Sequence, residues 1–242
     1  MITRTAIVTG ASRGIGRAIT ERLIEEGWRI YNFDREPPSE RQDLLDEWVS
    51  VDLTDPIALN EALERILNDG PILGVVNNAG IVGRQSIEDF TVEEFDRVMS
   101  TNARSAAQIV RKVVPGMRKA AFGRIVNISS RASLGKHDRT AYAAAKAGLT
   151  AMSRVWTLEL ASDGITSNTI APGPIETQLW AAANPADDPR TRDLIDSVPV
   201  GRLGTPVDIA NGVSFFMDER SGFVSGQILF VCGGLSVARA GS

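Results

Sequence analysis

The sequence predicts an α/β fold in which one parallel, doubly wound sheet of seven strands carries helices on both faces. Short apolar runs of strand length alternate with amphipathic stretches of helix length along the chain, and that alternation is typical of parallel sheets. The first apolar run leads through a glycine-rich turn into a helical pattern, as a strand-to-helix crossover does. No repeat, linker or low-complexity segment divides the 242 residues. We therefore expect a single domain over residues 1–242.

Composition limits the chemistry and the partners. The net charge of −4 and the isoelectric point near 5.2 argue against nucleic acid as the main partner. Cys232 and His137 are the only cysteine and histidine, so we expect neither an internal disulfide nor a His/Cys metal site. No apolar stretch reaches 18 residues and residues 4–8 already have a strand pattern. We therefore expect no membrane span and no signal peptide, and a cytoplasmic protein.

The first crossover predicts a dinucleotide site. A strand is expected at residues 4–9 and an amphipathic helix at residues 17–27, and the turn GASRGIG between them has glycines at positions 10, 14 and 16. Small residues let the backbone approach a pyrophosphate, whose charge the N-terminus of the helix can meet. A second strand at residues 28–33 leads to Asp34, about 20 residues after the glycines, where a carboxylate can bind a ribose diol.

The same turn also fits a hydrolase motif. Residues 10–14 satisfy G-x-S-x-G, the nucleophile elbow of α/β-hydrolases, and His137 could serve as the base. Such an elbow normally follows several strands, its histidine lies near the end of the chain, and an HGGG-type segment accompanies it. None of these holds here, so the dinucleotide interpretation is favoured.

The later elements continue the alternation. Pro56 lies in the first turn of one predicted helix, and a capping box of Thr91 and Glu94 begins the next. Asn102 lies within that second helix, where an asparagine is slightly unfavourable and needs either solvent or a function. Strands are expected at residues 48–51, 73–76, 124–128, 165–170 and 227–231, and helices at residues 55–68, 91–117, 140–160 and 206–217.

Residues 123–148 bring together a serine, a tyrosine and a lysine. The predicted strand at residues 124–128 ends in Ser129 and Ser130, and Tyr142 and Lys146 lie four apart, so a helix places them on one face. An ammonium about 5 Å from the phenol contributes roughly 3 kcal/mol, or about two pKa units, toward phenolate. We expect Lys146 to bring the pKa of Tyr142 close to the working pH, where an acid/base catalyst is most useful.

Taken together, these motifs resemble the classical short-chain dehydrogenase/reductase (SDR) family. The resemblance covers the whole chain and implies a Rossmann-type sheet, a nicotinamide cofactor, a small alcohol or ketone substrate, and a homotetramer that pairs the helices at residues 91–117 and 140–160. It further implies a catalytic tetrad of Asn102, Ser130, Tyr142 and Lys146. The motifs that carry it are Thr9-Gly10-x-x-x-Gly14-x-Gly16, Asn77-Asn78-Ala79-Gly80, Asn102, Ser130, Tyr142-x-x-x-Lys146 and Pro172-Gly173.

The resemblance also implies a cofactor-binding set. In it, Asp52 contacts the adenine, Asn78 borders the cofactor ribose, and Ile175 and Thr177 hold the nicotinamide carboxamide. The expected set is Gly10, Ser12, Arg13, Gly14, Ile15, Gly16, Asp34, Asp52, Leu53, Asn78, Ala79, Gly80, Tyr142, Lys146, Pro172, Gly173, Ile175 and Thr177.

The sequence departs from the family pattern at two places. The serine usually precedes the tyrosine by 13 residues, which selects Ser129, whereas the strand register selects Ser130. We prefer Ser130, because a loop can lose a residue more easily than a strand can slip. The second departure is Cys232, where the family more often has aspartate, and we interpret it as a small packed residue.

Asp34 predicts a preference for NAD, because its carboxylate suits the ribose hydroxyls and repels a 2′-phosphate. Arg13 and Arg35 favour NADP instead. The alternatives are an NADPH-dependent 3-oxoacyl-(acyl-carrier-protein) reductase and, in another class, a nucleotide-sensing or structural protein that keeps the fold without turnover.

Two surface features complete the predictions. Residues 175–200, with Leu179 and Trp180 on one side, are expected to form a mobile substrate lid. Arg84, Arg131 and His137 flank the strand ends and could select a polar or anionic substrate. Solvated surface charge is the favoured interpretation of those three.

Overall fold

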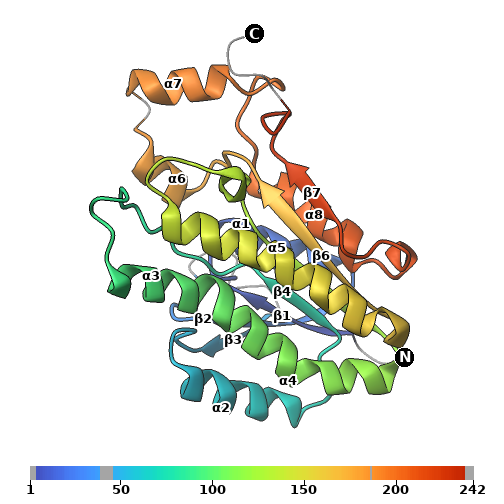
Figure 1. The fold of residues 1–242 in the computed structure, drawn as a ribbon. Coiled ribbons are helices and arrows are strands. Elements are labelled where there is room, and N and C mark those ends of the chain that lie inside the picture. Colours follow the sequence, from blue (N-terminus) through green and yellow to red (C-terminus); the bar gives the residue numbers. More distant parts are fainter. Residues whose placement is uncertain (1–3, 39–45, 186, 238–242) are drawn as a thin grey trace.

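The computed structural model describes residues 4–38, 46–185 and 187–237 and contains one seven-stranded parallel sheet (Figure 1). The strand order is β3-β2-β1-β4-β5-β6-β7, and every neighbouring pair is parallel. The predicted fold class is thereby confirmed. The strands are β1 (Thr5–Thr9), β2 (Arg29–Asp34), β3 (Asp46–Ser50), β4 (Gly74–Asn77), β5 (Gly123–Ile128), β6 (Ile165–Pro172) and β7 (Ile228–Val231).

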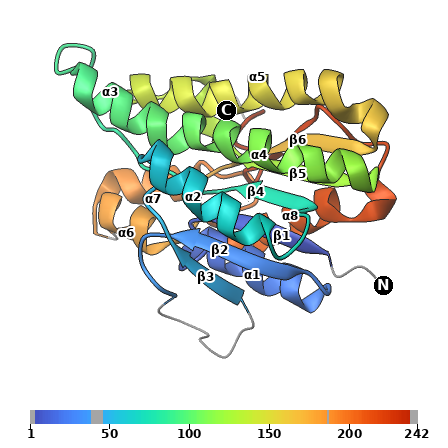
Figure 2. The same cartoon turned by 90° about the horizontal axis from the view of Figure 1, so that it is seen from below.

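Helices cover both faces of this sheet (Figure 2). One core cluster joins α2, α4 and α5 to the sheet, and a second joins α1 and α8 to its other face. The helices α6 and α7 lie beyond the carboxyl edge of the strands (Figure 1). The helices are α1 (Gly14–Glu25), α2 (Pro56–Leu67), α3 (Val92–Met99), α4 (Ser105–Ala120), α5 (Thr140–Leu160), α6 (Gln178–Ala183), α7 (Pro189–Asp196) and α8 (Pro206–Met217).

Burial on both faces explains why the central strands are apolar throughout. In β1, Ile7 belongs to one core cluster, and Ala6 and Val8 belong to the other. All three are fully buried, as expected for a parallel strand covered by helices on each side. Each buried Ile or Val stabilises the fold by roughly 1.5–3 kcal/mol relative to its exposed state.

Local signals set several of the helix starts. The carboxylate of Asp55 accepts hydrogen bonds from the backbone N–H groups of Ile57 and Ala58, and so caps α2. Thr205 and Asp208 form a capping box at the start of α8. Each of these two helices has a proline in its first turn, where the missing N–H costs nothing.

The predicted helix at residues 91–117 is interrupted. The structure has α3, then a π-helical turn over Ser100–Arg104, and then α4. A π turn inserts one extra residue into the helical ladder and is often associated with a functional residue. Here it contains Asn102.

The segment predicted as a lid contains two helices, α6 and α7, which the sequence analysis did not predict. Ala186 and the side chain of Leu179 lie outside the described residues. Both helices have short caps, since Thr177 accepts the N–H of Trp180 and Asp188 accepts the N–H of Arg190. Within the part of the chain that the structure describes, no helix combines the length and apolar character needed to cross a membrane.

Candidate active site

The glycine turn after β1 is closely packed against the end of β4. A Cβ on Gly16 would lie 2.0 Å from the carbonyl oxygen of Gly10, so no larger residue fits there without moving the turn. Gly10 and Gly14 have φ angles of +65° and +55°, the left-handed region that favours glycine. The side-chain amide of Asn78 donates to the carbonyls of Thr9 and Gly10 at 2.9 and 3.1 Å. Asn78 therefore holds the turn in shape, whatever else it contacts.

The turn leaves the N-terminus of α1 available to an anion. Arg13 occupies the N-cap position, and its side chain makes no capping hydrogen bond. The first N–H groups of a helix have no partner within the helix and attract phosphate. The tight glycine turn and these N–H groups together fit the pyrophosphate of a dinucleotide.

Asp34 lies at the carboxyl end of β2 beside this turn. Its carboxylate accepts the backbone N–H of Ser12 at 3.2 Å and that of Glu36 at 3.3 Å. The side chain of Trp48 donates to the Asp34 carbonyl at 3.1 Å. The carboxylate is thus held against the glycine turn, where the sequence predicted it.

The hydrolase alternative is wrong for this structure. Ser12 is buried, and its hydroxyl donates to the carbonyl of Glu36 at 2.5 Å. A nucleophile elbow requires an exposed serine hydroxyl. His137 is exposed in the loop before α5.

Asp52 and Leu53 lie in the turn that follows β3. One carboxylate oxygen of Asp52 accepts both the N–H and the hydroxyl of Thr54, at 2.8 and 2.7 Å. These bonds hold the pKa of Asp52 below its usual value. Leu53 is buried in the core. The predicted contact of Asp52 with adenine stays a prediction, and the visible role of this carboxylate is to shape the turn.

The structure separates the two candidate serines at the end of β5. Ser129 is buried, and its hydroxyl donates to the backbone carbonyl of Lys146 at 2.7 Å. Ser130 accepts the N–H of Ala132 at 3.1 Å, and its hydroxyl lies close enough to the Tyr142 phenol to lower the pKa of that phenol. The hydroxyl beside the phenol therefore belongs to Ser130.

Lys146 is buried directly below Tyr142. Its Nζ donates to the carbonyl of Ile128 at 2.7 Å and lies 5.8 Å from the centroid of the Tyr142 ring. Burial disfavours the ammonium and lowers the pKa of Lys146 to about 8. Loss of hydration likewise raises the pKa of Tyr142 above its usual value, although the Ser130 hydroxyl and the charge of Arg139 lower it in part.

The expectation that Lys146 brings the pKa of Tyr142 down to the working pH is therefore not met in this structure. The sequence showed the spacing of the two residues but not the packing that buries Lys146 and partly buries Tyr142. Loss of hydration destabilises the phenolate by more than the nearby positive charges stabilise it.

Asn102 points from the π turn toward the loop after β4. Its side chain accepts the N–H of Ile81 at 2.8 Å and donates to the Ile81 carbonyl at 2.9 Å. A Cβ on Gly80 would lie 3.2 Å from the Nζ of Lys146 and 3.4 Å from the Oδ1 of Asn102. Asn102, Gly80 and Lys146 thus converge, and the Asn102 amide holds the loop through two backbone bonds.

The last predicted residues follow β6. Pro172 ends that strand, and Gly173 packs closely against Cys232, where an added Cβ would lie 2.7 Å from the Cys232 Cα. Ile175 is buried, and a Cβ on Gly14 would lie 3.7 Å from the Thr177 side chain. The segment after β6 therefore returns to the glycine turn, and Cys232 is a buried packing residue.

Arg139 is one residue of this site that the sequence analysis did not single out. It is only 7% exposed, it precedes α5 and its charge acts on Tyr142. The burial of an arginine cannot be read from sequence, since most arginines are solvated. Within residues 4–38, 46–185 and 187–237, no three His, Cys, Asp or Glu side chains form a group that could hold a metal ion.

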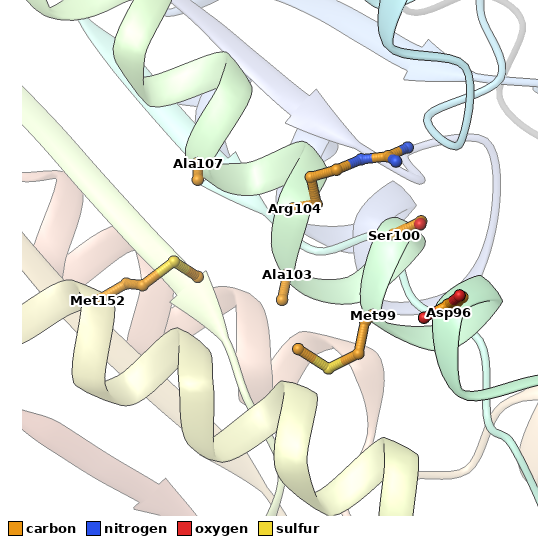
Figure 3. A pocket seen from close by; sticks show the side chains of 7 residues that line it. All are labelled: Asp96, Met99, Ser100, Ala103, Arg104, Ala107 and Met152. Carbon is orange, nitrogen blue, oxygen red and sulfur yellow. The ribbon is translucent and has the colours of Figure 1, made fainter. Parts of the chain in front are cut away.

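A separate cavity of about 540 Å³ lies between helices rather than at the strand ends (Figure 3). The side chains of Met99 and Met152 extend into it from α3 and α5. It is lined by Asp96, Met99, Ser100, Ala103, Arg104, Ala107 and Met152. The lining of this cavity includes none of Ser130, Tyr142 and Lys146, so it is no candidate for the reaction site.

Comparison with known proteins gives a consistent result. A family model described as enoyl-(acyl carrier protein) reductase matches residues 10–236. The chain is 37% identical to the 3-oxoacyl-(acyl-carrier-protein) reductase FabG of Vibrio cholerae over 239 residues, which cover 96% of this chain and 97% of the relative.

Two solved structures share the fold closely. The aldohexose dehydrogenase of Thermoplasma acidophilum superposes with a TM-score of 0.89 at 31% identity, covering 99% of this chain and 96% of that one. A structure from Beutenbergia cavernae with bound NADP superposes with a TM-score of 0.90 at 32% identity, covering 96% of both chains.

Proposed function

The chain belongs to the classical short-chain dehydrogenase/reductase family, as an NAD(P)-dependent oxidoreductase of CH–OH or keto substrates, and we propose that it uses NAD(H) and interconverts a secondary alcohol and a ketone. The observation that carries the proposal is the convergence of Ser130, Tyr142 and Lys146 at the carboxyl edge of the sheet, beside the glycine turn. Ligands of open parallel sheets bind at this edge, where the strand order reverses.

Tyr142 is the proton donor or acceptor in this proposal. Its raised pKa keeps the phenol neutral near pH 7, which is the form that donates a proton to a carbonyl oxygen during reduction. Ser130, whose hydroxyl lies beside the phenol, positions the substrate oxygen. Lys146 provides a positive charge below the ring, and in the family it also binds ribose hydroxyls. A nicotinamide bound at this edge supplies or accepts the hydride.

Asn102 acts as a positioning residue in this scheme. Both atoms of its amide bind the backbone of Ile81, and Gly80 beside it lies against Lys146. The proton relay through a water at Asn102, which the family resemblance implies, stays a prediction.

Three variants test these roles. Tyr142→Phe keeps the ring but removes the acid/base group, so kcat should fall by about 10²-fold or more while cofactor affinity changes little. Ser130→Ala should lower kcat far more than Ser129→Ala, because the Ser129 hydroxyl is engaged with the Lys146 carbonyl. Retention of a tenth of the turnover in Tyr142→Phe, or the reverse ranking of the serines, would contradict the assignment.

The preference for NAD follows from the place of Asp34. Its carboxylate accepts the Ser12 N–H beside the glycine turn and can accept ribose hydroxyl protons. Two like charges about 4 Å apart repel by roughly 4 kcal/mol at an effective dielectric near 20, and partial exposure reduces this. Arg13 and Arg35 are both exposed and offset part of the repulsion. We expect about 3 kcal/mol in favour of NAD, or about 10²-fold in kcat/KM.

Steady-state kinetics with both cofactors test the preference. Asp34→Ala should reduce the ratio chiefly by improving the use of NADP. Glu36→Ala is the matched control, because it removes an exposed carboxylate two residues away and should alter the ratio little. Equal or better use of NADPH by the wild type would refute the argument from Asp34.

A second candidate function is an NADPH-dependent reduction of 3-oxoacyl groups on an acyl carrier protein. It is favoured by the 37% identity to the Vibrio cholerae reductase and by Arg13 at the glycine turn. Turnover of acetoacetyl thioesters with NADPH, faster than that of small keto compounds with NADH, would select this candidate.

The remaining family expectations form part of the proposal. A homotetramer is supported by the open cavity beside Met99 and Met152 and by the exposed Val155 and Leu158 on α5. A monomeric mass by light scattering at micromolar concentration would contradict it. A single domain whose segment at residues 175–200 moves over the substrate, and a cytoplasmic location, are likewise proposed.

A further inference from the structure

Four cationic residues lie in the segments that border Ser130 and Tyr142. They come from three segments, because Arg84 follows β4, Arg131 follows β5 directly after Ser130, and Lys136 and Arg139 lie in the loop before α5. Arg84, Arg131 and Arg139 each disfavour the charge on Lys136, and Arg84 also disfavours the charge on Arg139. Arg139 also acts on Tyr142, three residues further along the chain.

The backbone holds these segments together. Gln85 and Arg139 form a parallel bridge, and the N–H of Gln85 donates to the carbonyl of Asp138 at 3.2 Å. Asp138 has a φ of +57°, an uncommon angle for a residue other than glycine. The bridge and the bend at Asp138 therefore hold the segment after β4 beside the loop that precedes α5.

Within the described residues, these four cations differ from other arginines in forming no ion pair with a carboxylate. Arg17, Arg118 and Arg202 each form an ion pair with an acidic side chain. In the described part of the chain, none of the four cations lies within 4.0 Å of a carboxylate oxygen. The hydrogen bond of the buried Arg139 goes to the neutral carbonyl of Asp138, at 2.8 Å, and the Asp138 charge only partly offsets its surroundings.

Clustered cations without counter-charges destabilise the folded chain, and an anion placed among them relieves the repulsion. We propose that the substrate carries a carboxylate or phosphate group, which Arg139 and Lys136 bind while Arg84 and Arg131 supply further positive charge. This rests on the proposed function and narrows its substrate to short-chain hydroxy and keto acids or their phosphate analogues. Arginine offers a planar fork that suits both anions.

The burial of Arg139 favours an anion on the substrate itself over the acidic surface of a protein. A protein surface contacts exposed side chains, whereas Arg139 is only 7% exposed and its charge acts on Tyr142. Three residues on a helix span roughly 4.5 Å along its axis. The bound anion and the reacting carbon therefore belong to one small molecule.

Matched pairs of substrates test the proposal. Hydroxy acids of four to six carbons are compared with their methyl esters in the oxidation assay. The wild type should prefer the acids at least tenfold in kcat/KM, mainly through KM. Arg139→Gln and Lys136→Gln should each bring the acid-to-ester ratio toward one, whereas Arg139→Lys should retain part of it. Arg154→Gln, an exposed arginine further along α5, should keep the wild-type ratio.

A binding measurement separates this inference from the proposed function. Malonate and inorganic phosphate are titrated calorimetrically into the protein, and Lys136→Gln, a change at an exposed position, should weaken binding at least fivefold. Stronger binding of phosphate than of malonate would identify a phosphate ester as the substrate anion. If the methyl esters are turned over as fast as the hydroxy acids, the anion-binding inference is wrong, but the proposed oxidoreductase function is unaffected. If the protein oxidises no alcohol, the proposed function is refuted. Equal binding of malonate and phosphate by the wild type and Lys136→Gln would then refute the anion site as well.

Discussion

The buried ammonium of Lys146 should make the stability of the protein depend on pH in an unusual direction. The pKa of this lysine is lowered from 10.5 to about 8 by burial alone. Between these two values the unfolded chain holds more protons than the folded chain, so the free energy of unfolding rises with pH. The interval corresponds to about 3 kcal/mol at about 1.4 kcal/mol per pKa unit. Most of that gain, about 2.5 kcal/mol, should appear between pH 7 and pH 10.

The measurement is a set of urea unfolding curves at steps from pH 7 to pH 10, for the wild type and for Lys146→Met. Subtracting the variant removes the contributions of all other titrating groups, including Cys232, whose pKa is lowered from 9.0. The opposite effect of Tyr142, whose pKa is raised from 10.0, sets in as the unfolded tyrosine ionises near pH 10 and is small up to that pH. The difference between the two proteins should be nearly flat below pH 8 and then rise. Curves that stay parallel up to pH 10 would refute the desolvation of Lys146.

Two further predictions concern the support of the site. Gly16→Ala places a Cβ 2.0 Å from the Gly10 carbonyl oxygen and should reduce cofactor affinity at least tenfold in a fluorescence titration. The control is Gly148→Ala on α5, whose added Cβ meets no atom within 4 Å. It should leave stability unchanged or raise it by up to about 1 kcal/mol. Arg17→Met breaks an ion pair with Asp46 in which both side chains are at most 4% exposed. It should lower the free energy of unfolding in urea by about 3–5 kcal/mol. The control, Arg118→Met, breaks an exposed pair and should lower that free energy by less than about 1 kcal/mol.

The sequence predicted best those elements that residues with strong backbone preferences delimit. The predicted and observed bounds of α8 agree at residues 206–217, because Pro206 and the Thr205 cap fix its start. The bounds of α5 agree at residues 140–160. The strand ends that carry Asp34 and Ser130 were also predicted, since β2 and β5 are apolar runs followed by polar residues.

Tertiary contacts determine what the sequence could not predict. The π turn at Asn102 coincides with two side-chain hydrogen bonds to Ile81, a residue 21 positions away that no local pattern links to it. The helix α7 did have a local signal, Asp188 followed by Pro189, but its few apolar residues made it resemble a loop. The burial of Lys146 and Arg139 depends on the packing of several segments, so neither pKa could be predicted from spacing alone.

The choice between Ser129 and Ser130 shows how a strand register decides an active-site residue. Asn127 on β5 accepts a hydrogen bond from Asn77 on β4 at 2.7 Å, and Ile128 pairs with Ile170 on β6. A slip of one residue would break both contacts and send every side chain of β5 to the opposite face.

The loop between Ser130 and Tyr142 can absorb a missing residue instead. It contains a short 3-10 turn over Arg131–Leu134, which the Ser130 hydroxyl caps, and then Gly135 and Asp138 at φ angles of +109° and +57°. Such angles reverse the chain in few residues. With β5 fixed between its neighbours and α5 fixed by its packing, the shortened loop leaves the Ser130 hydroxyl on the phenol of Tyr142 and the Ser129 hydroxyl on the carbonyl of Lys146.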